Sequence, residues 1–96
     1  MAQGAVKALD AAGVTHGVDG DVIVMGFDCN KWALEELKAG NWNYDGQCNP
    51  FQSQYILDVI QQIEAGSAPA EKTIIMDEKG FDATTITADD VSTYGI

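Results

Sequence analysis

Asp21-Val-Ile-Val-Met-Gly-Phe-Asp28 is the stretch that decides the fold. Its four consecutive apolar residues, Val22 to Met25, predict a strand over residues 21–27 that is central in a parallel sheet and buried on both faces. A helical pattern follows at once over Lys31–Ala39, with Ala33, Leu34 and Leu37 on its inward face, and ends at Gly40. A buried strand followed by a helix is typical of α/β proteins, so we place the chain in that class.

Helices and strands alternate along the rest of the chain. The further predicted helices end at a glycine or begin at a capping residue, and they cover residues 4–12, 49–66 and 87–90. The further predicted strands are an edge strand at 42–47 and a short strand at 72–76. We therefore expect a three-layer αβα arrangement around a partial parallel sheet, in a single domain over residues 1–96.

The charge of the chain excludes several kinds of partner. Fifteen Asp and Glu stand against five lysines and no arginine, which gives a net charge of -10. Nucleic acid and anionic membranes are therefore not expected to bind. One histidine and scattered carboxylates show no metal-ligand spacing, and no cofactor motif is present. No residue before Met1 caps the first helix, which indicates a sequence that starts inside a helix and is truncated.

Polar residues stand where two predicted strands end. Asp28 follows the first strand and Gln47 the second, and ligands of such sheets bind beyond the carboxyl ends of the strands. A carboxylate and an amide together accept and donate hydrogen bonds, as sugar hydroxyls require. The alternatives are that Asp28 only caps the following helix and that Gln47 is an exposed edge residue.

Four segments together resemble the last third of periplasmic sugar-binding proteins of the ribose and galactose type, the receptors of ABC importers. They are Met1–Gly13, Val24–Asp28, the stretch from Leu37-Lys-Ala-Gly40 to Gly46-Gln-Cys-Asn-Pro50, and Glu64-Ala-Gly66. The resemblance implies the carboxy-terminal lobe of a two-lobed type I periplasmic binding protein, with the amino-terminal lobe absent. It also implies that Asp28 and Gln47 hold a monosaccharide.

Residues around Asp28 extend the expected site. Asn30 is either a second polar contact or a helix cap, and Trp32 can face the cleft and stack on a sugar ring. Phe27 and Trp42 are expected to pack in the core. The carboxylate pairs Glu35-Glu36 and Asp89-Asp90 are expected at helix surfaces.

The resemblance implies a carbohydrate solute-binding component of an ABC importer, and the partner of such a component is a membrane permease. It also implies a location outside the cytoplasm, either in the periplasm or as a lipoprotein at the cell surface. This fragment would supply one wall of the sugar cleft and no enzyme activity. Two alternatives remain open. One is the sensor domain of a lactose-repressor-family regulator, and the other is a small α/β thiol enzyme that uses Asp28 and Cys29.

Cys29 and Cys48 follow the ends of neighbouring predicted strands, so they can either form a disulfide or remain free thiols. His16 is expected as a solvated loop residue, because no spacing pairs it with Cys29 as a catalytic base.

In the resembled family the flanking strands of the sheet lie before Met1. An open edge at residues 21–27 therefore predicts a homodimer.

Overall fold

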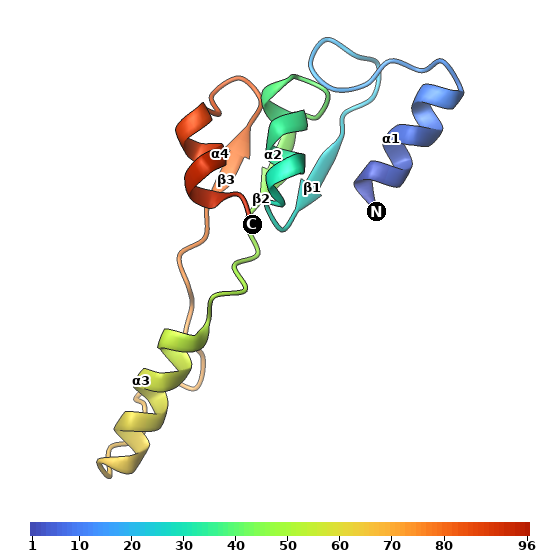
Figure 1. Ribbon diagram of the computed structural model, residues 1–96. Coiled ribbons are helices and arrows are strands. Elements are labelled where there is room, and N and C mark those ends of the chain that lie inside the picture. Colours follow the sequence, from blue (N-terminus) through green and yellow to red (C-terminus); the bar gives the residue numbers. More distant parts are fainter.

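The computed structural model describes residues 1–96 and consists of a small α/β body from which a helical arm projects (Figure 1). The helices are α1 (Ala2–Ala11), α2 (Lys31–Lys38), α3 (Ser53–Glu64) and α4 (Ala88–Tyr94). The strands are β1 (Met25–Phe27), β2 (Tyr44–Gly46) and β3 (Gly80–Asp82). The predicted α/β class is confirmed.

The sheet has the order β1-β2-β3, with β1 parallel and β3 antiparallel to β2. This order corrects two predictions, since the stretch at 21–27 provides an edge strand and the expected edge strand is central. Burial on both faces is also wrong, because Ile23, Met25 and Phe27 are 72%, 63% and 71% exposed. They lie on a face of the sheet over which no helix packs, whereas Val24 and Gly26 point to the core.

The core lies between the sheet, α2 and α4 (Figure 1). Helix α2 contributes Ala33, Leu34 and Leu37, whose spacing places them on one face as predicted. Thr87 caps α4 as expected, in a capping box with Asp90. The remaining core side chains come from the strands, their flanks and α4, and they are Val24, Cys29, Trp42, Phe81 and Val91.

The third strand lies later in the chain than predicted. The expected strand at 72–76 does not pair, and the third strand begins at Gly80 instead. Two hydrogen bonds lead into this pairing: the Gln47 N–H donates to the Lys79 carbonyl at 2.8 Å, and the Lys79 N–H donates to Gln47 Oε1 at 3.1 Å. Gly80 also leaves room for the Tyr44 ring, because a Cβ there would overlap the Tyr44 hydroxyl.

The arm contains α3 and the extended chain that returns from it to β3 (Figure 1). It gives the molecule dimensions of 61 × 25 × 17 Å and a radius of gyration of 17.9 Å, against about 13 Å for a compact chain of this length. The helix begins at Ser53, three residues after Pro50, because the Asn49 side chain first accepts the Phe51 N–H in a turn at 2.9 Å. No helix of the chain has the length and apolar character needed to span a bilayer.

Replacing Gly26 tests the packing of β1 on the core. A Cβ at Gly26 would lie 2.6 Å from Cζ3 of the buried Trp42 ring. We expect Gly26→Ala to lower the free energy of unfolding by about 1–3 kcal/mol, because the ring has to move. Urea unfolding followed by tryptophan fluorescence measures this change.

Gly4→Ala is the matched control, because no atom lies within 4 Å of its Cβ position in α1. Alanine there should stabilise the helix by about 0.5–1 kcal/mol. Equal effects of the two substitutions would contradict the packing of Gly26 against Trp42.

Candidate functional site

A strained turn directly follows β1. Asp28 and Cys29 have φ angles of 91° and 53°, in the left-handed region that residues other than glycine seldom adopt. The Asp28 N–H donates to the Gly46 carbonyl at 2.9 Å, and the Cys29 carbonyl accepts the N–H of Ile96 at 3.1 Å. Such strain persists only where the surrounding structure holds it, and it concentrates at functional sites. Here β2 and the last residue of the chain hold the turn.

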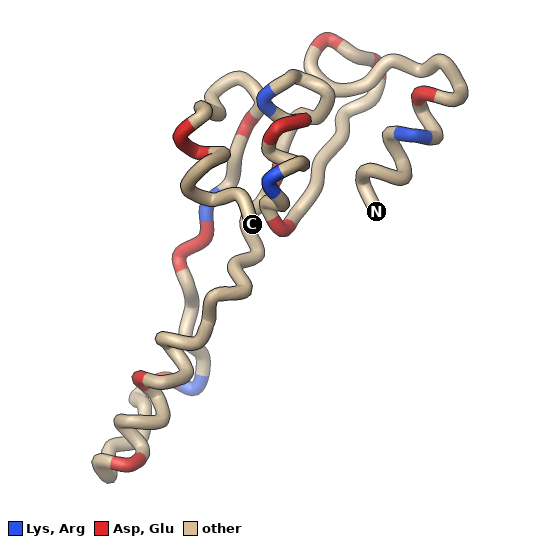
Figure 2. The backbone as a smooth tube through the Cα atoms, in the orientation of Figure 1, with Lys and Arg blue, Asp and Glu red and all other residues tan.

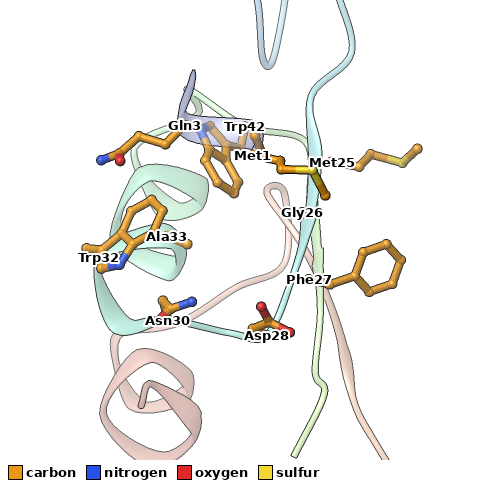
Figure 3. A pocket seen from close by; sticks show the side chains of 11 residues that line it. Met1, Gln3, Met25, Gly26, Phe27, Asp28, Asn30, Trp32, Ala33 and Trp42 are labelled. Atoms are coloured by element: carbon orange, nitrogen blue, oxygen red, sulfur yellow. The ribbon is translucent and has the colours of Figure 1, made fainter. Parts of the chain in front are cut away.

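A cavity of about 220 Å³ lies beside this turn, between the start of α1, β1 and the start of α2. Figure 3 shows Asp28 and Asn30 together at one end, Met1 and Trp42 at the opposite end, and Trp32 on the α2 side. Three of the four predicted binding residues, Asp28, Asn30 and Trp32, therefore line one pocket.

The polar side chains of this pocket are open to a ligand. Asn30 is the N-cap residue of α2, but its side chain makes no capping hydrogen bond. Asp28 is exposed and is not the cap of α2. The Asp28 carboxylate and the Asn30 amide thus lie next to each other, and neither side chain caps α2.

Trp32 provides the aromatic wall of the pocket. Its side chain is 42% exposed, and its ring meets that of Trp42 edge-on, with centroids 5.8 Å apart at 88°. Trp42 is buried, which confirms its predicted place in the core. The same prediction for Phe27 is wrong, because its ring lies on the uncovered face of the sheet, where Gly46 leaves room for it.

Gln47 lies apart from the other predicted site residues. It is absent from the pocket lining, and its side-chain oxygen accepts the Lys79 N–H. Gln47 therefore helps to hold the chain that leads into β3. The Nε2 group of its amide makes no hydrogen bond with that chain and remains a donor.

The cysteines occupy different environments and are both free. The disulfide weighed for them is not formed, since Cys29 belongs to the core and Cys48 is exposed. Burial, together with the nearby carboxylates of Asp45 and Asp28, raises the pKa of the Cys29 thiol to about 12. A protonated thiol is a poor nucleophile.

His16 is more ordered than expected for a solvated loop residue. Its ring bonds the Asp10 carboxylate through Nε2 and the Asn41 carbonyl through Nδ1, both at 2.9 Å. These hydrogen bonds raise its pKa, and they join the loop after α1 both to α1 itself and to the chain before β2. No group of three or more metal-ligating side chains gathers in the structure.

Asp45 is the site feature that the sequence did not predict. It lies on β2, opposite Gly26 of β1, and its side chain is fully buried with no hydrogen-bond partner at either oxygen. Burial, together with the charge of Asp28, raises its pKa to about 6. The backbone N–H groups of Cys29 and Gly46 face the carboxylate and oppose this rise, although neither meets the geometry of a hydrogen bond. In the predicted edge strand at 42–47, Asp45 alternates with Tyr44 and Gly46, and this half-buried pattern places polar residues on the exposed face.

Comparison with known proteins adds structural likeness alone. No described protein family and no curated protein matches the sequence. A crystal structure from Mycobacterium smegmatis matches 86% of the chain with a TM-score of 0.72 and 26% identity. Another from that organism, in complex with β-D-fucofuranose, matches 84% with a TM-score of 0.68 and 27% identity. The chain shares its fold with part of a sugar-bound protein. It spans 27% and 26% of the length of those two chains.

The titration of Asp45 gives the first test of this site. Its pKa rises from 3.8 in the unfolded chain to about 6 in the folded protein. The folded state therefore binds the proton more tightly, and this contribution to stability is full below pH 4 and is lost as the pH rises through 6. Asp45→Asn should abolish that loss and exceed wild type in stability at pH 7.5 by up to about 3 kcal/mol.

Urea unfolding at pH 4.5 and pH 7.5 measures the difference between the two proteins. His16, whose pKa is also raised, titrates in both and cancels from the comparison. A wild-type minus variant difference that is the same at both pH values would contradict the burial of a titrating Asp45.

Proposed function

We propose that this chain forms one wall of a monosaccharide site, in which Asp28, Asn30 and Trp32 contact the sugar. The observation that carries the proposal is the pocket itself, where a carboxylate on the strained turn, an amide that makes no capping hydrogen bond and a half-exposed indole line one cavity. Support comes from the likeness in fold to a protein in complex with β-D-fucofuranose.

The chemistry of the pocket suits a neutral sugar. Adjacent hydroxyls are both donors and acceptors, so the Asp28 carboxylate accepts from them while the Asn30 amide donates and accepts. Hydrogen bonds to a carboxylate are about twice as strong as neutral ones. The exposed face of Trp32 offers an apolar surface to the C–H side of a sugar ring. Gln47 lies outside this pocket, and its side-chain oxygen already accepts the Lys79 N–H.

The finer role we propose is the carbohydrate-binding component of an ABC importer, which delivers a monosaccharide to a membrane permease from outside the cytoplasm. Its support is the sequence resemblance to sugar-binding proteins of the ribose and galactose type. We assign the chain no enzyme activity, and the protonated state of Cys29 removes the thiol nucleophile of the alternative reading. A full cleft needs further walls, because the chain matches only 26% of the length of the sugar-bound neighbour.

Asp28→Asn tests the sugar site. Asparagine keeps the shape of the side chain and tolerates a positive φ, so the turn should survive. Loss of the charge should weaken D-fucose binding at least about tenfold, since hydrogen bonds to charged groups contribute about 1.5–3 kcal/mol. An NMR titration of the Trp32 indole N–H with D-fucose measures this affinity.

Asp77→Asn is the control, because Asp77 is exposed and lies outside the pocket. It removes the same charge and should leave D-fucose binding unchanged. Equal affinity of wild type and Asp28→Asn would refute the assignment of Asp28.

We further propose that the chain self-associates, since it carries two complementary unpaired surfaces. No backbone–backbone hydrogen bond involves residues 68–78, and within them Ile74 and Ile75 are exposed. The outer edge of β1 is also unpaired, beside the exposed Met25 and Phe27. Charged residues are sparse along α3 in Figure 2, so the arm of one copy can approach the sheet edge of another.

Ile75→Glu tests this contact, because Ile75 is 86% exposed within the unpaired segment. Wild type should elute with twice the mass of one chain, and a charge at this position should return it to a monomer. Size exclusion with light scattering measures the masses. Ser67→Glu, which places the same charge at the tip of the arm, should remain dimeric. A monomeric wild-type mass at every concentration would rule out the dimer.

A further inference from the structure

Asp45 is a buried carboxylate that the proposed sugar site does not use. It is the one charged side chain in the interior, and it does not line the pocket. An ionised group without hydrogen bonds in such a place opposes folding. Asp45 therefore lowers stability without contacting the proposed ligand, which indicates a role other than direct binding.

The surroundings of Asp45 point toward the turn after β1. Asp28 is the charged group that acts on Asp45, and the Cys29 thiol beside it is neutral. The buried side chains that α2, β3 and α4 contribute to this core are apolar: Ala33, Leu34, Leu37, Phe81 and Val91. On the side of β1, Gly26 lies next to the carboxylate, since a Cβ there would be 3.5 Å from Asp45 Oδ1.

The turn has a donor that lacks a partner. No backbone carbonyl accepts the N–H of Cys29, and this N–H faces the Asp45 carboxylate. An acceptor and a donor that both lack a hydrogen-bond partner therefore lie near each other at the turn that carries Asp28.

We propose that Asp45 is a positioning residue: its carboxylate holds the N–H of Cys29, and through it fixes the strained turn that presents Asp28 to the pocket. The part played by the sugar rests on the proposed function, whereas the contact with Cys29 does not. The ionised carboxylate attracts the N–H more strongly than the neutral acid does. The turn is therefore fixed when Asp45 is ionised and relaxes when it is protonated.

NMR of the wild-type chain without sugar tests the contact directly. The amide proton of Cys29 should move downfield as the pH rises from 4.5 to 7.5, with a midpoint near 6. In Asp45→Asn this titration should be lost, whereas Asp77→Asn should retain it. A Cys29 amide shift that does not change with pH in wild type would overturn the inference, whether or not the variant folds.

Binding and stability together separate positioning from a merely structural role. Asp45→Asn should be more stable than wild type at pH 7.5 and yet bind D-fucose about tenfold more weakly. Wild-type affinity should fall as the pH is lowered through 6, and that of Asp45→Asn should not. Unchanged affinity in Asp45→Asn, with the Cys29 titration present in wild type, would show that the turn does not depend on Asp45.

The two hypotheses fail in different ways. If wild type and all variants show no D-fucose binding, the proposed function is wrong, and the amide titration of Cys29 still decides the contact with Asp45. If wild type binds D-fucose but the Cys29 amide does not titrate, the sugar site stands and the positioning role of Asp45 is wrong.

Discussion

The close approach of β1 to Trp42 at Gly26 is the constraint on which the rest of the body depends. Because Gly26 has no Cβ, the indole ring of Trp42 can pack directly against the backbone of β1. Trp42 thereby fills the space between the sheet and α2. The same glycine lies opposite Asp45 in the parallel pair of strands. Gly26 thereby determines how closely Trp42 packs against β1. It also lies next to the buried Asp45 and just before the turn at Asp28 and Cys29.

The turn after β1 gathers contacts from distant parts of the chain. Ile96 forms hydrogen bonds with Cys29 and Lys31, so the last residue of the chain fastens the segment between β1 and α2. Two acids, Asp28 and Asp45, also lie close enough for the charge of one to raise the pKa of the other. A buried acid without hydrogen bonds lowers stability, and such features occur where a structure holds a strained turn.

The body and the arm distribute their apolar residues differently. In the body, α2 turns its apolar face onto the sheet. Helix α3 has an equally clear apolar pattern, yet none of its residues is buried. An apolar helical face predicts burial against some surface, and it does not specify which one. The exposed face of the sheet at Met25 and Phe27 has the same character.

The sequence alone determined the α/β class, α2 with its inward face, the cap of α4 at Thr87, and the grouping of Asp28, Asn30 and Trp32 near the end of a strand. Each follows from local rules of periodicity, capping and chain order. Tertiary structure decided that β1 lies at the edge, that β3 begins at Gly80, that Gln47 binds Lys79, and that Asp45 is buried. These depend on pairings between residues far apart in the chain, and hydrophobic alternation carries no information about which strand lies beside which or which face is covered.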